Sequence, residues 1–204
     1  MAEPANDRRL KLGPGEKLVL ASASPRRREL LEKAGIPFVC MPSDEDESQV
    51  GGLPPFLLVQ ALAELKARSV AGRLPPGTLV LGADTVVLLD GRIFGKPADR
   101  EEAARMLKAF SGRIHQVATG VFIARTAEAP ESWPTRKWTC TSDVKFRKLD
   151  MDDIAAYHAL VNPLDKAGGY AVQEHGEMVV EGVEGLLSNV VGLPVEEVAE
   201  VVLG

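Results

Sequence analysis

Residues 17–35 read KLVLASASPRRRELLEKAG. Lys17 to Ala21 has the short apolar composition of a buried strand. Ser24 is a favoured N-cap residue, Pro25 suits the first helical position, and Gly35 suits a helix end. The stretch therefore predicts a strand that leads directly into a helix beginning at Pro25.

Three arginines, Arg26 to Arg28, occupy the first turn of that predicted helix. A helix N-terminus carries partial positive charge and free backbone N–H groups, so basic side chains are unfavourable there unless an anion is present. A helix start of this kind is suited to phosphate, and several cations favour a polyphosphate. The alternative is a solvated face, on which Arg28 pairs with Glu32 one turn later. We adopt the alternative for Arg28 and predict an anion site at Arg26 and Arg27.

The overall charge excludes one class of partner. The chain has 24 basic and 29 acidic residues and a net charge of −5. Binding to duplex nucleic acid depends on neutralising phosphates, so we expect no nucleic-acid partner. An arginine cluster on an acidic protein is more consistent with a pocket for a specific anion.

The remaining bulk features predict a cytoplasmic protein. Cys40 and Cys140 have the spacing of neither a metal site nor a disulfide framework. No apolar run is long enough to span a membrane, so we expect no membrane association. Residues 1–16 lack a hydrophobic segment, so we expect a flexible N-terminal extension before a domain over residues 17–204.

Hydrophobic periodicity predicts strands and helices that intermix along the chain. We expect helices over about 56–70, 99–110 and 152–160, and after Pro194. We expect strands over about 38–41, 78–89, 114–124 and 139–148, and a last strand that includes 171–173 and 178–180. This pattern predicts a mixed α/β (α+β) class with a sizeable sheet.

Asp84 is a lone carboxylate within an apolar strand. An unpartnered buried carboxylate is costly, so Asp84 should be paired, protonated or bound to a metal. Either backbone amides satisfy it at a kink permitted by Gly82, or it carries out chemistry.

A hairpin signal follows this strand at Asp90-Gly91. If Leu89 faces Arg92 across the turn, then Thr85 faces Lys96. Ideal pleating would direct Asp84 and Lys96 to opposite faces, so a bulge or splayed end is needed to bring both to one site.

Gln173 follows a glycine-rich run that includes Gly168 and Gly169. Paired glycines allow a ligand to approach the backbone closely. A glutamine amide offers one donor and one acceptor, which complement the N3–H and adjacent carbonyl of uracil or thymine. From the residues alone, Gln173 serves equally well as a structural hydrogen bonder.

Eight ordered motifs over roughly residues 17–203 resemble the Maf family of nucleoside triphosphate pyrophosphatases, also called septum formation inhibitor proteins. The motifs are Ala21-Ser-Ala-Ser-Pro-Arg-Arg27, Asp46-Glu-Ser48, Leu62-Ala63 to Lys66-Ala67, Gly82-Ala-Asp-Thr85, Gly95-Lys-Pro97, Ser111-Gly112, Asp165-Lys-Ala-Gly168 and Asn189-Val-Val-Gly-Leu-Pro194.

The resemblance implies a fold similar to that of inosine triphosphate pyrophosphatase, with a mixed sheet and two lobes around a central cleft. It implies hydrolysis of a nucleoside triphosphate to the monophosphate and pyrophosphate. A divalent cation, Mg²⁺, Mn²⁺ or Co²⁺, is the implied cofactor, and a homodimer is the implied assembly.

The resemblance also implies roles for individual residues. Asp84 matches the proton acceptor, with Lys96 beside it as a second catalytic residue. The implied metal ligands are Glu47 and Asp84. The implied substrate-binding residues are Ser22, Arg26, Arg27, Lys66, Thr85 and Gln173.

Three functional hypotheses follow from these motifs. The first is the branch of the family that acts on dTTP and UTP, because Arg26, Thr85 and Gln173 match positions associated with substrate choice. The second is a pyrophosphatase for 7-methyl-GTP or another noncanonical nucleotide. The third is a nucleotide-binding regulator of cell division with weak turnover.

Overall fold

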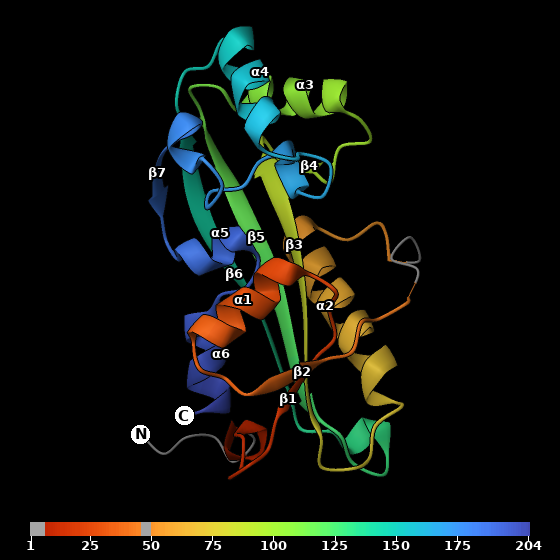
Figure 1. The fold of residues 1–204 in the computed structure, drawn as a ribbon. Helices are drawn as coiled ribbons and strands as arrows, with labels where there is room; N and C mark the ends of the chain where they lie inside the picture. Colours follow the sequence, from red (N-terminus) through yellow and green to blue (C-terminus); the bar gives the residue numbers. More distant parts are fainter. Residues whose placement is uncertain (1–6, 46–49) are drawn as a thin grey trace. The chain divides into compact units, whose positions relative to one another are not determined.

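A computed structural model describes residues 7–45 and 50–204 of the chain (Figure 1). Its strands are β1 (Leu18–Leu20), β2 (Phe38–Cys40), β3 (Leu79–Leu89), β4 (Arg92–Phe94), β5 (Ile114–Arg125), β6 (Thr135–Phe146) and β7 (Val180–Glu184). Its α-helices are α1 (Pro25–Lys33), α2 (Pro55–Ala71), α3 (Arg100–Phe110), α4 (Met151–Leu160), α5 (Leu187–Val191) and α6 (Val195–Val202). Short 3-10 helices are η1 (Asp7–Leu10), η3 (Pro130–Ser132), η4 (Ala167–Gly169) and η5 (Gly176–Met178).

The strands form one mixed sheet in the order β2-β1-β3-β5-β6-β7, with β4 paired to β3. β1 lies parallel to both β2 and β3, whereas β3–β4 and β6–β7 are antiparallel. The mixed α/β class expected from the sequence is confirmed.

The chain divides into two compact units. The first comprises Met1–Asp84, Thr119–Cys140 and Gly192–Gly204. The second comprises Thr85–Ala118 and Thr141–Val191. The long strands β3, β5 and β6 contribute residues to both units.

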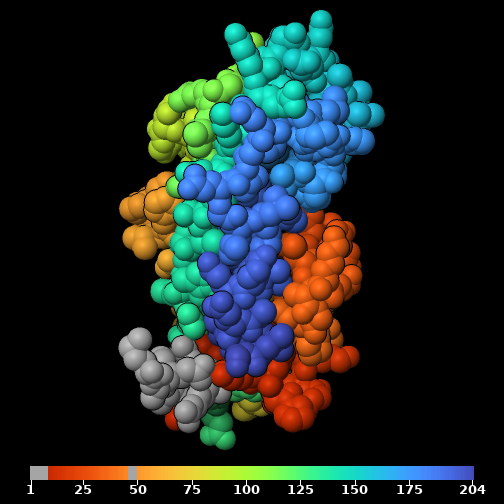
Figure 2. Space-filling view, turned by 90° about the vertical axis from the view of Figure 1, so that its left-hand side faces the viewer, coloured from red at the N-terminus to blue at the C-terminus, as the bar shows by residue number. Residues whose placement is uncertain are grey.

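Helices cover both faces of the sheet in the first unit (Figure 1). Leu79 and Leu81 of β3 belong to a core with α1 and α6, whereas Val80 belongs to a second core with α2. Successive side chains of a strand point to opposite faces, and both faces are covered here, which explains why β3 is apolar at each position from Leu79 to Leu81. Figure 2 shows α6 beside α1 on the surface of this unit.

Two glycines let α2 approach the sheet closely. A Cβ at Gly82 would lie 2.1 Å from the carbonyl oxygen of Ala63, and a Cβ at Gly120 would lie 2.3 Å from that of Val59. The helix therefore packs against strand backbone, which fixes its position over β3 and β5.

Part of the segment expected to be a flexible extension is packed. Leu10 has no exposed surface and belongs to the core beneath α6. The Leu12 N–H donates to the carbonyl of Val202 at 2.8 Å. Residues 10–12 thus contribute to the first unit.

An aromatic core fills the second unit. Phe110, Phe146 and Tyr170 pack edge to face around His115, which is 2% exposed. These rings come from α3, β5, β6 and the loop after η4, so they join the helices of this unit to its part of the sheet.

The expected strand over 171–173 and 178–180 is wrong for most of its length. Residues 172–175 form turns and bends, η5 follows, and β7 begins only at Val180. The Tyr157 hydroxyl bonds both the N–H and the C=O of Ala171, so a side chain takes the groups that a strand partner would use. His175 has a φ of 52°, which also interrupts an extended chain.

Candidate functional site

The start of α1 is built as the sequence predicts. Ser24 is the N-cap, its hydroxyl accepts from the Arg27 N–H at 3.5 Å, and Pro25 opens the helix. No acidic residue lies in the first turn of α1. The positive end of the helix is therefore not neutralised by its own carboxylates, which suits an anionic ligand.

Arg27 points into the protein. It is 9% exposed, its Nε donates to the carbonyl of Gly192 at 2.8 Å, and one terminal nitrogen donates to Ser22 Oγ at 3.2 Å. The guanidinium joins the turn before α1 to the turn before α6. This geometry favours a positioning role for Arg27 over the expected direct contact with an anion.

The Ser22 hydroxyl is oriented by two donors. Its oxygen accepts from Arg27 and also from the Ser24 N–H at 3.2 Å. A serine hydroxyl has two acceptor lone pairs and one proton. With both lone pairs engaged, its proton is directed away from these partners, where it can be donated to a ligand oxygen.

Asp84 is paired with Lys66. Lys66 Nζ lies 2.6 Å from Asp84 Oδ1, and each side chain is 13% exposed. The structure thus supplies a paired partner for Asp84, one of the ways in which the sequence expected this carboxylate to be compensated. The signal for it was the spacing of small residues: Ala63 and Ala67 pack on Gly82, which brings Lys66 over the strand to Asp84.

Asp84 and the start of α1 lie toward the same end of neighbouring parallel strands. Leu20 of β1 pairs with Leu81 of β3, and the Ala21 N–H donates to the Leu81 carbonyl at 2.8 Å. Ser22 and Asp84 both follow this pairing in the carboxyl direction. Ligands of α/β sheets commonly bind beyond the carboxyl ends of parallel strands.

The hairpin after β3 is confirmed, but its register does not reach Lys96. Leu89 pairs with Arg92, and β4 ends at Phe94. The Gly95 carbonyl accepts from the Gly168 N–H at 2.9 Å, so the chain departs from β3 toward the glycine-rich loop. The expected pairing of Thr85 with Lys96 is wrong for this reason. Lys96 is exposed.

The site residues expected from the sequence are distributed over the two compact units, apart from one that is not described. Ser22, Arg26, Arg27, Lys66 and Asp84 belong to the first unit, and Arg26 is half-buried in α1. Thr85, Lys96 and Gln173 belong to the second unit, where Gln173 is exposed in a turn. Glu47 lies outside the described residues.

The donor chemistry of Asp84 fits a hard divalent cation. Mg²⁺ takes oxygen ligands and is commonly held by one or two carboxylates together with substrate phosphates and waters. Within residues 7–45 and 50–204, no group of three His, Cys, Asp or Glu side chains could hold a metal ion. Asp84 would therefore hold such an ion with substrate oxygens, and with Glu47 if that side chain reaches it.

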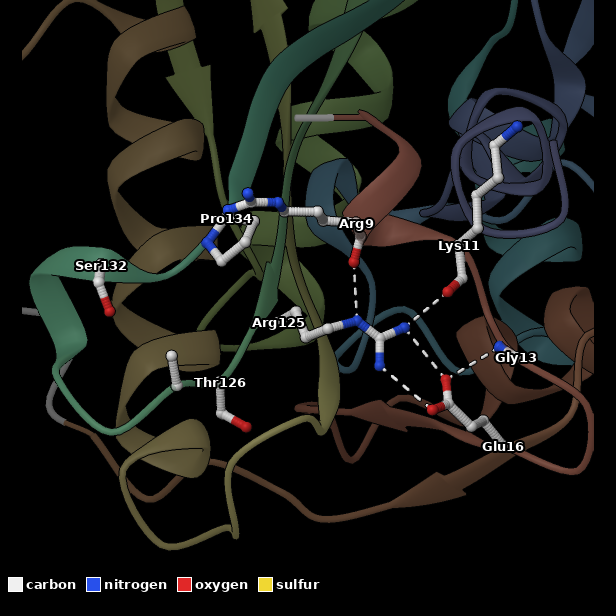
Figure 3. Close-up of a pocket in the computed structure, with 9 residues that line it drawn as sticks. Arg9, Lys11, Gly13, Glu16, Arg125, Thr126, Ser132 and Pro134 are labelled. Carbon is white, nitrogen blue, oxygen red and sulfur yellow. Dashed lines mark hydrogen bonds and ion pairs between the residues drawn. The ribbon is translucent and has the colours of Figure 1, made fainter. Parts of the chain in front are cut away.

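A separate pocket of about 650 Å³ lies in the first unit (Figure 3). Arg125 in its wall donates to the carbonyls of Arg9, Lys11 and Gly77 and forms an ion pair with Glu16. The hydrogen bond from the Gly13 N–H is the main reason why the pKa of Glu16 lies below its ordinary value, and the hydrogen bond from Arg125 lowers it further. These bonds tie residues 9–16 to the end of β5, so we interpret this pocket as part of the scaffold.

Comparisons with known proteins agree on one family. A family model described as Maf-like protein matches residues 17–203. A dTTP/UTP pyrophosphatase of Moorella thermoacetica is 51% identical over 184 residues, which cover 90% of this chain and 92% of that protein. Proteins with the same name from Pelotomaculum thermopropionicum and Akkermansia muciniphila are each 46% identical and cover 91% and 92% of this chain, and 94% and 95% of their own lengths.

A solved structure was also found. It is described as a nucleoside-triphosphatase / dITP/XTP pyrophosphatase from Mycobacterium abscessus, is 16% identical, and covers 90% of this chain and 92% of that chain with a TM-score of 0.45. That likeness is too low to establish a shared fold. In the described part of the chain, no helix is long and apolar enough to cross a membrane.

Proposed function

The chain belongs to the family of Maf-like proteins, and from this premise we propose that it is a nucleoside triphosphate pyrophosphatase acting on dTTP and UTP. The observation that carries the proposal is the Asp84–Lys66 pair on β3, just beyond the carboxyl end of the parallel neighbour β1, after which α1 begins. It unites a base, a cation and a phosphate-binding helix start in one unit. The names of the relatives support the choice of substrate.

Several residues of the first unit would bind the triphosphate. The N–H groups at the start of α1, the Ser22 hydroxyl and Arg26 would hold the triphosphate. Lys66 would neutralise a phosphate oxygen while it keeps Asp84 in place. Arg27 would act on Ser22 rather than on the ligand, because its guanidinium is engaged with Ser22 and Gly192.

Asp84 would accept the proton of the attacking water. The water oxygen forms a bond to the α-phosphorus, the bond from that phosphorus to the bridging oxygen breaks, and pyrophosphate leaves with the electron pair. A bound Mg²⁺ or Mn²⁺, held by Asp84 and Glu47, would supply charge neutralisation for the phosphates. Positioning and charge neutralisation would contribute most of the rate enhancement.

The second unit would supply recognition of the base. Gln173 is exposed and offers a donor and an acceptor to the Watson–Crick edge of thymine or uracil. Lys96 would contact the phosphates, and Thr85 would contribute to substrate choice. Cytoplasmic location and the homodimeric state remain predictions.

The test is a panel of dTTP, UTP, dCTP, dGTP and 7-methyl-GTP with separate readouts of phosphate and pyrophosphate. We expect pyrophosphate from dTTP and UTP in the presence of Mg²⁺ or Mn²⁺. A higher kcat/KM for 7-methyl-GTP would favour the second branch of the family. Nucleotide binding without turnover would favour the regulator and contradict the proposal.

Asp84→Asn is expected to lower kcat by at least about a hundredfold, the size of a general-base contribution, while nucleotide affinity stays within about tenfold. The matched control is Asp90→Asn on the adjacent hairpin, where the carboxylate is exposed and pairs with Arg113. It should retain full activity. Unchanged turnover in Asp84→Asn would remove Asp84 from the mechanism.

A further inference from the structure

The loop that carries Gln173 is held at several points within the second unit. Lys166, 4% exposed, donates to the carbonyl of Asn162 at 3.0 Å and forms an ion pair with Glu174 at 3.3 Å. This pair joins residues on either side of Gln173 and closes the loop. The loop backbone that carries the exposed Gln173 is therefore held by contacts before and after that residue.

The glycines of the loop make this close packing feasible. Gly168 and Gly169 have φ values of 73° and 74°, a region that favours glycine. A Cβ at Gly168 would lie 3.2 Å from Phe110, and one at Gly169 would lie 3.3 Å from Ala103. The loop backbone therefore lies directly on α3.

Tyr157 of α4 fixes the backbone two residues before Gln173. Its hydroxyl accepts from the Ala171 N–H at 3.0 Å and donates to the Ala171 carbonyl at 3.1 Å. The ring has no exposed surface. Burial raises the pKa of Tyr157 to about 12, so the hydroxyl keeps the proton that it donates. Two opposed bonds to one residue restrict both peptide groups that flank Ala171.

We propose that Tyr157 is a positioning residue for base recognition, acting through Ala171 to hold the Gln173 amide in the orientation that reads thymine or uracil. The inference rests on the proposed function, because Gln173 must be the base reader. A glutamine on an unrestrained turn would have to be ordered at each binding event, which weakens binding. The two hydrogen bonds between the Tyr157 hydroxyl and Ala171, here called the Tyr157 clamp, order this backbone before the ligand binds.

The experiment uses Tyr157→Phe, which keeps the buried ring and removes only the hydroxyl. Two substrates separate the base from the phosphates: dTTP, and 2-deoxyribose 5-triphosphate, which lacks a base. We expect KM for dTTP to rise by about tenfold, the size expected when one hydrogen bond from Gln173 to the base is lost, with kcat nearly unchanged. For the base-less substrate, kcat/KM should change by less than about twofold.

The chain offers a closely matched control. The Ser111 hydroxyl donates to the Leu149 carbonyl at 3.0 Å and accepts from the Leu149 N–H at 2.7 Å, the same pair of bonds as in the Tyr157 clamp. Ser111→Ala removes this second clamp, which lies outside the Gln173 loop. It should leave the ratio of kcat/KM for the two substrates as in the wild type.

A double-mutant cycle with Gln173→Ala tests whether Tyr157 acts through Gln173. Adding Tyr157→Phe to Gln173→Ala should cause no further loss with dTTP. An equal loss on both substrates, a further loss in the Gln173→Ala background, or no loss at all would each overturn the inference and leave Tyr157 a purely structural residue.

Hydrogen exchange supplies a readout that is independent of turnover. The Ala171 amide should exchange faster in Tyr157→Phe and at the wild-type rate in Ser111→Ala. Unchanged exchange would overturn the clamp itself. If Tyr157→Phe does not fold, Glu174→Gln takes its place, because it removes the ion pair with Lys166 at the edge of the same loop. It should again raise KM for dTTP only, and an equal effect on both substrates would overturn the inference.

The two proposals fail differently. A wild-type protein that releases no pyrophosphate from any triphosphate contradicts the proposed function. An active wild type in which Gln173→Ala leaves KM for dTTP unchanged contradicts the base-reading role of Gln173 and the positioning inference that rests on it, but leaves the proposed hydrolysis standing.

Discussion

Arg27 combines a full positive charge with a buried position in the first turn of α1. Its position in the first turn of α1 predicted contact with an anion, yet the guanidinium donates to Ser22 and Gly192 inside the first unit. An arginine has five N–H donors in a planar fork, so it can hold two partners at once. In the proposed function, the triphosphate is therefore held by the backbone N–H groups, the Ser22 hydroxyl and Arg26 rather than by Arg27.

Arg27→Lys is therefore expected to destabilise the protein by about 1–3 kcal/mol and to lower kcat/KM, although the charge is preserved. A lysine has a single nitrogen and cannot reproduce the fork, so a buried acceptor loses its donor. Urea unfolding and steady-state kinetics measure the two effects. Arg28→Lys, at the exposed neighbouring position, is the control and should change neither. Equal behaviour of the two variants would contradict the positioning role.

Asp84 is a residue whose need for a partner was evident from the sequence. The sequence showed that a carboxylate in an apolar strand needs a partner, and the structure supplies Lys66 at 2.6 Å. Either side chain alone would leave a largely buried charge without compensation, which is strongly unfavourable. The pair is therefore both a structural requirement and the centre of the proposed chemistry.

At the scale of elements, the position of α2 depends on glycines in the strands beneath it. Gly82 and Gly120 lie against the helix backbone, and neither has room for a Cβ. Lys66 reaches Asp84 only because the helix lies this close to β3. The geometry of the site is thus set by the packing of one helix on two strands.

Gly120→Ala is expected to lower the free energy of unfolding by about 1–3 kcal/mol or more, because the added methyl must displace helix or strand backbone. Gly182→Ala in β7 is the matched control, since a Cβ there meets nothing within 4 Å and the residue does not need positive φ. Thermal or urea unfolding of the two variants measures the difference. A similar loss in both would show that strand glycines matter here for a reason other than space.

At the scale of the whole molecule, buried histidines link stability to pH. His115 is 2% exposed among Phe110, Phe146 and Tyr170, and its Nε2 is hydrogen-bonded to the Tyr170 hydroxyl at 2.7 Å. Burial lowers the pKa of His115 to about 3, and burial also lowers the pKa of His158. Each side chain therefore takes up its proton at a lower pH in the folded state than in the unfolded chain.

The lowered pKa values of the two histidines make the folded state less stable at acid pH. Below the ordinary histidine pKa of about 6.5, the unfolded state binds a proton that folded His115 does not, so stability falls as pH decreases toward about 3. Between pH 7 and pH 5 the expected loss from His115 is about 2 kcal/mol. His115→Gln should reduce the pH dependence by that amount, as measured by urea unfolding at the two pH values. An identical pH dependence in wild type and variant would contradict the assignment.

Features that depend on neighbouring residues could be predicted from the amino-acid sequence. The strand and capped helix over residues 17–35, the hairpin at Asp90-Gly91 and the mixed class follow from short-range patterns of apolar, capping and turn residues. The ordered motifs likewise identified the family. The short helix α5, only five residues long, was missed because it is too short for a periodic pattern to appear.

The assembly of the candidate site depends on contacts between distant residues and could not be predicted from the sequence. Lys66 and Asp84 are 18 positions apart, Arg27 and Gly192 are 165 apart, and Tyr157 and Ala171 are 14 apart. Each contact is a polar side chain brought to its partner by helix packing and loop closure. The residue pattern of one segment does not indicate which distant atom its polar side chains will bond, because the partner depends on how the whole chain packs.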